Sequence, residues 1–85
     1  MIKIQALKVM ENHLIKLSFN DGTAKVIDFQ PFIGDDKLTK PLADPIFFSQ
    51  VKTYPNGRGI YWPNDYDFCP DFLYKYVPEV QLARV

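Results

Sequence analysis

Alternation of apolar and polar residues with a period of two runs through residues 2–29, and it restricts the chain to a fold built on antiparallel strands. The apolar positions of this pattern include Ile2, Ile4, Ile15, Leu17 and Phe19. Such alternation is typical of strands that bury one face. Because turn-forming residues interrupt the pattern at 11–13 and 20–22, the sequence predicts a three-stranded antiparallel meander.

The Asp-Gly pair at 21–22 predicts how the second and third strands pair. A two-residue hairpin loop requires positive φ angles, which Asp and Gly tolerate. A loop of this kind places Phe19 opposite Ala24 and Leu17 opposite Val26, all on one face. The opposite face of the hairpin then holds Ser18 and Lys25. Beyond residue 26 the apolar positions change face, which indicates a bulge or a strand covered on both sides.

Proline, glycine and aspartate divide the rest of the chain into short elements. Asp44 can cap a helix in which Pro45 takes the first position, so we expect a short amphipathic helix through residue 51. The further expected segments are a loop at 30–40, a turn at 55–57 that opens a hairpin into 59–62, a turn at 63–65, and a helix that starts at 70–71 and covers 72–77. The predicted fold class is α+β: an antiparallel three-stranded meander, a short helix, a second hairpin or short strands, and a short C-terminal helix.

The chain of 85 residues has the size of one small domain, which we place at residues 1–78 with a tail at 79–85. A domain of this size has a thin core, so a homodimer is one expectation. Ten Lys and Arg residues balance ten Asp and Glu residues, and this balance argues against direct binding of nucleic acid.

Cys69 is the only cysteine, so no disulfide can form within the chain and a reducing, cytoplasmic location is expected. Polar residues interrupt the apolar positions between Ile2 and Val9. That segment has neither the apolar run of a signal peptide nor the length of a membrane span, and we expect no membrane association.

Few residues suggest catalysis. His13 is the only histidine, and we interpret it as a solvent-facing turn residue with no serine to activate. Cys69 lies between Phe68 and Pro70. Its neighbours in sequence include aspartates, so we interpret it as a small buried apolar group rather than a nucleophile. We therefore predict no catalytic residue, no cofactor and no enzymatic activity.

Two patterns offer alternatives to this interpretation. Asp65, Asp67 and Asp71 could hold a hard cation, although the glycine and distal glutamate of a calcium loop are absent from the sequence around them. Otherwise Asp67 or Asp71 caps the second helix. Glycines flank Arg58 in a short segment that could meet a phosphate, but turn geometry alone accounts for both glycines.

Most aromatic side chains gather between residues 54 and 76, together with prolines, turn formers and aspartates. Because Trp, Tyr and Arg are enriched at binding hot spots, we interpret this segment as a recognition face with Trp62 and Arg58 as anchors. Alternation points Ile60 and Trp62 one way and Tyr61 the other. The rival interpretation is that half of these rings close the core. The predicted partner-binding residues are Arg58, Tyr61, Trp62, Asp65, Tyr66, Asp67, Asp71 and Tyr74.

Five motifs follow one another along the chain: Phe19-Asn20-Asp21-Gly22, Val26-Ile27-Asp28, Pro41-Leu42-x-Asp44-Pro45-x-Phe47, Gly59-Ile60-x-Trp62-Pro63-Asn64 and Asp67-x-x-Pro70-Asp71-x-Leu73-Tyr74. In this order they resemble the bacterial family known as domain of unknown function 2442, over residues 2–76. Members of that family commonly carry glycine where this chain has Asp65.

The resemblance implies a small α+β domain with no assigned activity and no catalytic residues. Members are sometimes fused to a helix-turn-helix DNA-binding domain and are often encoded beside another small protein, in what looks like a toxin–antitoxin arrangement. Because this chain ends at Val85, it has no room for such a domain, and we expect another small protein, encoded by the adjacent gene, as its partner. An antitoxin-like interaction module is therefore expected. The alternative is a small-ligand or nucleotide-binding domain that uses Arg58 and the aromatic surface, or a metal-dependent enzyme.

Overall fold

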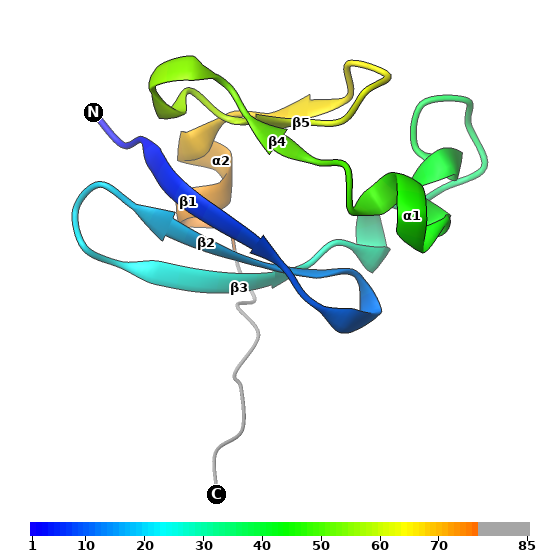
Figure 1. The fold of residues 1–85 in the computed structure, drawn as a ribbon, viewed down its shortest axis with the longest axis horizontal. Coiled ribbons are helices and arrows are strands. Elements are labelled where there is room, and N and C mark those ends of the chain that lie inside the picture. The colour runs from blue at the N-terminus through cyan, green and yellow to red at the C-terminus, as the bar shows by residue number, and fades with distance from the viewer. Residues whose placement is uncertain (77–85) are drawn as a thin grey trace, which may run out of the picture.

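The computed structural model describes residues 1–76, which form two small antiparallel sheets and several short helices (Figure 1). The first sheet contains β1 (Ile4–Val9), β2 (Leu14–Phe19) and β3 (Ala24–Asp28), in that order. The second contains β4 (Lys52–Thr53), β5 (Ile60–Tyr61) and β6 (Asp67–Phe68). The helices are α1 (Pro45–Phe48) and α2 (Pro70–Lys75), and short 3₁₀ turns lie at Glu11–His13, Gln30–Phe32, Lys40–Ala43 and Pro55–Gly57.

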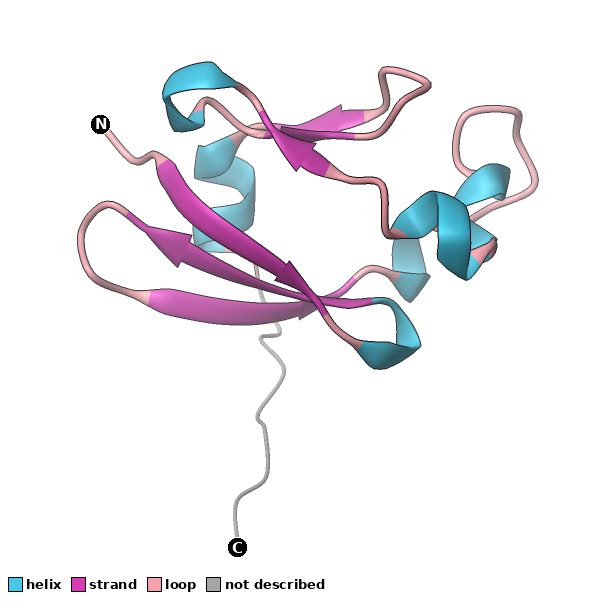
Figure 2. Cartoon of the chain, viewed as in Figure 1, coloured by secondary structure: helices cyan, strands magenta, loops and turns pink. Residues whose placement is uncertain are grey.

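This order of elements confirms the predicted α+β class and the three-stranded meander. Figure 2 shows that loops and short helical turns make up the chain between β3 and β4. The tail that we expected at residues 79–85 lies outside the described residues.

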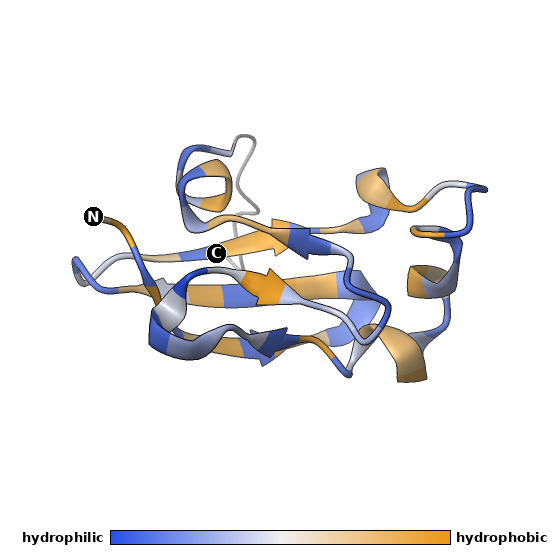
Figure 3. Ribbon diagram, turned by 90° about the horizontal axis from the view of Figure 1, so that it is seen from above, coloured by the Kyte–Doolittle hydropathy of each residue, from blue (hydrophilic) through white to orange (hydrophobic). Residues whose placement is uncertain are grey.

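One core joins the two sheets and the two helices. Apolar and polar residues alternate along the longer strands (Figure 3), and most of the apolar ones point into this core, as the period-two pattern requires. The largest fully buried side chains are Phe19, Phe29, Ile15, Leu17, Ile27, Leu42, Ile60, Trp62 and Leu73.

The pairing of β2 with β3 differs from the predicted register by one residue. Leu17 lies opposite Lys25 rather than Val26, and Phe19 is not paired with Ala24. A shift of one residue turns every side chain of a strand to the other face. The predicted faces of β3 are therefore wrong.

A three-residue loop causes the shift. The N–H of Phe19 donates to the carbonyl oxygen of Thr23 (2.8 Å), and the N–H of Gly22 donates to the carbonyl oxygen of Phe19 (3.1 Å). Gly22 has a φ of 93°, whereas Asp21 is not among the residues of 1–76 with positive φ. These contacts describe a type I turn followed by one left-handed residue, not the two-residue turn with two left-handed residues that we predicted.

The observed register brings Lys25 to the core face of the first sheet. Its ammonium group donates hydrogen bonds to the carbonyl oxygens of Leu73 (3.2 Å), Tyr74 (2.7 Å) and Tyr76 (2.7 Å), at the C-terminal end of α2. The last carbonyl groups of a helix have no partner within the helix and carry partial negative charge. Lys25 therefore fastens α2 to the first sheet.

The predicted change of face along β3 is explained by burial on both sides. Val26 is 6% exposed and Ile27 is 0% exposed, and they point to opposite faces. The pairing of β2 with β3 contains no bulge. The irregularity lies instead between β1 and β2, where the register shifts between Ile4 and Ala6.

The turn between β1 and β2 contains two consecutive left-handed residues. Asn12 and His13 have φ angles of 62° and 63°, as in a type I′ turn, where glycine is usual at the second position. Nε2 of His13 lies 2.9 Å from the carbonyl oxygen of Leu42, and the imidazole packs edge-on against Phe48 with ring centroids 4.7 Å apart. The expected solvent-facing position of His13 is wrong, because these two contacts hold the half-buried ring against the core.

The first helix starts as predicted and is shorter than predicted. Oδ1 of Asp44 accepts a hydrogen bond from the N–H of Ile46 (3.0 Å), which is the expected cap. The helix ends at Phe48, which is 2% exposed, while Ile46 is 71% exposed. The second helix begins at Pro70 but ends at Lys75, before the predicted end at residue 77, because the next residue is extended.

The start of α2 corrects two further expectations. Cys69 occupies the N-cap position with no side-chain cap, so neither Asp67 nor Asp71 caps the helix. Cys69 is exposed, and its expected burial is wrong because the chain turns at the surface between β6 and α2. None of the helices within residues 1–76 has the length and the apolar character that a bilayer crossing needs.

Candidate interaction surface

Two glycines position the second sheet against its neighbours. Gly57 and Gly59 have φ angles of 70° and 143°. A methyl group on Gly57 would overlap the carbonyl oxygen of Ile4 in β1, and one on Gly59 would overlap the carbonyl oxygen of Phe68 in β6. Only glycine permits such a close approach. The loop between β4 and β5 therefore lies directly on β1 and β6.

The outer face of this sheet is made by Lys52, Tyr54, Tyr61 and Asp67, which we call the polar sheet face. Lys52 lies opposite Tyr61, and Tyr61 lies opposite Asp67, so their side chains share one face. Tyr54 directly follows β4. Lys52 and Asp67 are exposed, and the two tyrosines are half-buried. Figure 1 shows β4 and β5 along the upper rim of the molecule.

The two tyrosines of the polar sheet face hold each other in place. Their ring centroids lie 4.5 Å apart and their planes differ by 26°. The hydroxyl of Tyr54 donates a hydrogen bond to Oδ2 of Asp67 (2.7 Å). This hydrogen bond, followed by desolvation and the charge of Asp67, raises the pKa of Tyr54 to about 12. The phenol therefore stays neutral at physiological pH and keeps its hydrogen bond.

Asp65 adds a second carboxylate at the tip of the hairpin between β5 and β6. It is exposed, and its charge contributes to the raised pKa of Tyr54. Its φ of 71° is left-handed, a conformation that glycine adopts most easily. This geometry fits the glycine that the resemblance to the family implies at the position.

Trp62, which we expected to be a binding anchor, is a core residue. Its side chain is 0% exposed, and Nε1 donates to the carbonyl oxygen of Phe48 (2.9 Å). The prediction that Ile60 and Trp62 point one way and Tyr61 the other is confirmed, but the direction of Trp62 is inward. The surface role predicted for Trp62 is therefore wrong. Its ring packs against those of Phe29, Phe48, Tyr66 and Phe68.

Two further residues of the predicted site lie at the edge of the core. The ring of Tyr66 packs against Phe68 with centroids 5.2 Å apart, and burial, followed by the charge of Asp36, raises the pKa of Tyr66. Tyr74 lies on α2, and its hydroxyl donates to Oδ2 of Asp21 (2.6 Å) in the loop between β2 and β3. Neither tyrosine belongs to the polar sheet face.

The predicted site residues thus divide among three places. Tyr61, Asp65 and Asp67 gather at the second sheet, three rings lie in or beside the core, and Arg58 and Asp71 line a separate cavity at the start of α2. In the described part of the chain, no group of three or more His, Cys, Asp or Glu side chains is arranged to hold a metal ion. The three aspartates considered as cation ligands are therefore not gathered into one site.

The predicted partner-binding residues omitted two members of the polar sheet face, Lys52 and Tyr54, although Tyr54 lies in the segment that we interpreted as a recognition face. The available signal was the polar Lys52 after the apolar Val51, followed by the β-branched Thr53 and the aromatic Tyr54, a composition typical of a strand. Only the second arm of this hairpin, after Gly57, was predicted as a strand. The first arm, β4, was assigned to no element, because the predicted helix ended at residue 51.

The fold and this surface define a small α+β domain with two short antiparallel sheets, one of which presents a polar, tyrosine-containing face. The family described as "Protein of unknown function (DUF2442)" matches residues 4–79. The match spans most of the chain, so the chain belongs to this family, as its motifs suggested. No curated protein and no solved structure matches the chain.

Proposed function

We propose that this chain is a protein-interaction module that binds a basic partner protein through the polar sheet face and Asp65. The observation that carries the proposal is the stacked pair of Tyr54 and Tyr61, which Asp67 locks by a hydrogen bond of 2.7 Å. Tyrosine is among the residue types that supply most binding energy at interfaces.

The side chains of the polar sheet face are held in fixed conformations, and this favours binding. A side chain that is already held in one conformation loses little entropy when a partner covers it. Tyrosine has only two rotatable side-chain bonds and offers both an apolar ring and a polar hydroxyl. Because Tyr54 and Tyr61 already restrain each other, the exposed part of each ring can bind a partner without further ordering.

The charge of the surface selects the partner. Asp65 and Asp67 outweigh the single ammonium group of Lys52, so the face attracts lysine and arginine side chains. Complementary charge at the rim of an interface mainly raises the association rate and discriminates against wrong partners. The association rate should therefore fall as the salt concentration rises.

We further propose that the chain is the antitoxin-like member of a two-protein system and that the adjacent gene encodes its partner. This more specific proposal is supported by the resemblance to a family whose members are often encoded beside another small protein. The basic partner expected from Asp65 and Asp67 is compatible with it. The proposal gives the chain no catalytic role.

Co-expression with the product of the adjacent gene tests the proposal. Tyr61→Ala should weaken the complex by about 2 kcal/mol, or roughly 30-fold in Kd, and Asp67→Asn should weaken it less. Lys16→Ala is the matched control, because Lys16 lies on the outer face of the first sheet opposite Lys8. A complex that withstands Tyr61→Ala and Tyr54→Ala together would exclude the polar sheet face. Sedimentation of the chain alone distinguishes a homodimer from a complex with a second protein.

A further inference from the structure

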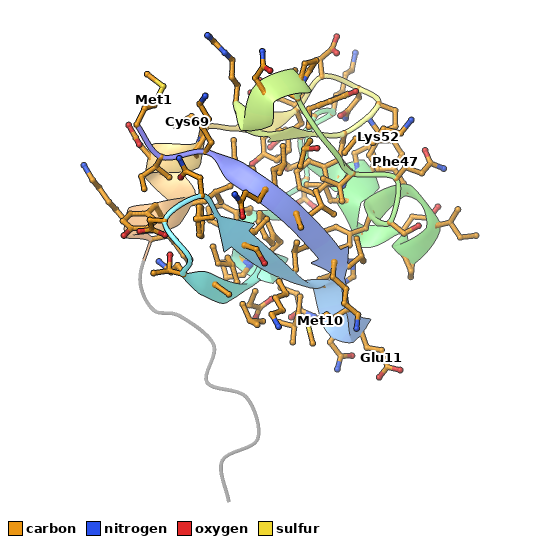
Figure 4. The ribbon with its side chains drawn as sticks, turned by 60° about the vertical axis from the view of Figure 1, so that its left-hand side comes forward. Met1, Met10, Glu11, Phe47, Lys52 and Cys69 are labelled. Atoms are coloured by element: carbon orange, nitrogen blue, oxygen red, sulfur yellow. The ribbon has the colours of Figure 1, made fainter. Side chains whose placement is uncertain are left out.

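A small cavity lies where the N-terminal segment meets the start of α2. Its volume is about 190 Å³. Figure 4 shows Met1 and Cys69 at the same corner of the molecule, far from the turn that carries Met10 and Glu11. Water occupies about 30 Å³ per molecule, so the cavity holds a ligand of only a few heavy atoms. The residues that line it are Met1, Ile2, Lys3, Arg58, Cys69, Pro70 and Asp71.

The glycines on either side of Arg58 explain why it lies at this cavity. Gly57 lies against the backbone of Ile4, and Gly59 lies against the backbone of Phe68. Arg58 is thus held between two points of close backbone contact. Lys3 directly precedes Ile4, and Cys69 directly follows Phe68. The short loop that carries Arg58 therefore brings the walls of the cavity together.

The charges of the cavity favour an anion. The walls carry the guanidinium group of Arg58, the ammonium group of Lys3 and one carboxylate, that of Asp71. Among residues 1–76, the ammonium group of Lys3 and the guanidinium group of Arg58 form no hydrogen bond or ion pair with another residue, and the hydrogen bond from Lys3 to Asn20 comes from its backbone N–H. Both cations therefore have donors that a ligand can use. Arginine presents paired N–H groups whose geometry matches a carboxylate.

We propose that this cavity binds a small oxyanion, a carboxylate or a phosphate, with Arg58 as the bidentate donor and Lys3 as the second cation. Asp71 offsets part of the positive charge, and the amino group of Met1, which also lines the cavity, adds to it, so the net charge attracts an anion. The paired N–H groups of Arg58 fit the oxygen atoms of either group. The site is separate from the polar sheet face. It corresponds to the small-ligand site with Arg58 that the sequence offered as an alternative to a protein-interaction module.

Amide NMR spectra of isotope-labelled protein test the site, with no tag at the N-terminus because Met1 lines the cavity. Sodium acetate is added in steps to the protein, and sodium chloride is reduced in parallel so that the ionic strength stays constant. We expect saturable shifts of the amide signals at residues 57–59, 69 and 71, and a parallel titration with inorganic phosphate shows which of the two oxyanions binds more tightly. Peptides with a free or an amidated C-terminus then show whether the carboxylate of a polypeptide also binds. Shifts that saturate with neither anion would overturn the proposal.

Two variants of equal charge change complete the test. Arg58→Gln should abolish the saturable shifts, whereas Lys16→Gln, on the outer face of the first sheet, should leave them unchanged. Signals far from the cavity should coincide with those of the unmodified protein, which shows that the variants are folded. Equal acetate binding by Arg58→Gln would refute the role of Arg58. Partner binding, measured on the same variants, reports on the polar sheet face independently.

Discussion

The two sheets of this domain are held together by different contacts. The strands of the first sheet are five or six residues long and pair along most of their length. Each of the three strands of the second sheet is only two residues long, and a sheet with so few paired residues has little stability of its own. The second sheet therefore depends on what lies under and beside it: the ring of Trp62 and the close backbone contacts of Gly57 and Gly59.

This comparison teaches that the proposed binding surface is supported from inside. Tyr61 and Trp62 are neighbours in sequence that face opposite sides of the second sheet. The buried ring of Trp62 fixes the position of the strand and therefore also the position of the half-buried ring of Tyr61 on the outer face. A change in the core beneath the second sheet should therefore alter the polar sheet face more than a change beneath the first sheet does.

The largest expected effect is that of Trp62→Ala. It removes the central ring of the aromatic cluster and leaves the carbonyl group of Phe48 with only the long hydrogen bond from the N–H of Val51 (3.4 Å). We expect a loss of about 3–5 kcal/mol in the free energy of unfolding, a large part of the roughly 4–13 kcal/mol that a domain of this size has. Urea denaturation followed by far-ultraviolet circular dichroism measures the loss.

Hydrogen exchange of the same variant sharpens the comparison. Amide protons of β4, β5 and β6 should lose protection before those of β1, β2 and β3, since the longer ladders persist without the indole. Trp62→Phe, which retains a ring, is the control. Equal loss of protection in both sheets would show that they unfold as one unit.

The next largest effect is expected from Gly57→Ala, compared with Gly22→Ala. Both glycines have left-handed φ angles, so each substitution strains the backbone by about 1 kcal/mol or more. Only at Gly57 does the added methyl group also meet a neighbouring backbone, that of Ile4, while at Gly22 the space is open. Thermal unfolding should show a clearly larger loss for Gly57→Ala, and equal losses would contradict the close contact between the second sheet and β1.

Lys25→Met is expected to have an intermediate effect that is confined to α2. The aliphatic part of the side chain remains, but the carbonyl groups of Leu73, Tyr74 and Tyr76 lose the ammonium donor. That of Leu73 keeps only the N–H of Tyr76 (3.4 Å). Hydrogen bonds from charged groups contribute about 1.5–3 kcal/mol when they are shielded, and this half-buried one should lie near the lower end. Denaturation and hydrogen exchange of α2 measure the change. Lys16→Met should change the stability by less than about 0.5 kcal/mol.

The smallest effect concerns the ionisation of Tyr54. Its pKa is raised from 10.0 to about 12 by the hydrogen bond to Asp67. A raised pKa in the folded state means that the neutral form is stabilised by folding. This contribution is complete below pH 10 and is lost as the pH rises toward 12. The pKa values of Tyr66 and Tyr74 are also raised, so near-ultraviolet absorbance should show several tyrosines that titrate late. Tyr54→Phe should remove the one that titrates near 12, and Asp67→Asn should shift it toward 10.0.

The fold was predictable where local pattern and tertiary structure agree. The alternation around Leu17 predicted the meander correctly, and Asp44 followed by Pro45 predicted the start of α1. The register of β2 with β3 was not predictable from Asp21 and Gly22 alone. These residues fit a two-residue loop and a three-residue loop equally well, and the ladder that decides between them includes Lys25, whose partners lie on α2.

The candidate surface was predictable only in part. The aromatic composition of residues 54–76 indicated a recognition face, and the alternation at Tyr61 and Trp62 gave their directions relative to each other. Which direction leads outward depends on how the second sheet packs on the first, and nothing local encodes that. Arg58 was separated from Tyr61 for the same reason, because the contacts of its flanking glycines bind it to β1 and β6.

Because Lys25 contacts α2, the reactivity of its primary amine reports whether the helix is docked on the first sheet. Its nitrogen is surrounded by three carbonyl oxygens, whereas Lys8 and Lys16 point away from the core and are exposed. An amine-reactive reagent should therefore acylate the exposed lysines first and reach Lys25 only when the helix detaches. Mass spectrometry of the labelled peptides would report that opening in crude mixtures, without purification of the protein.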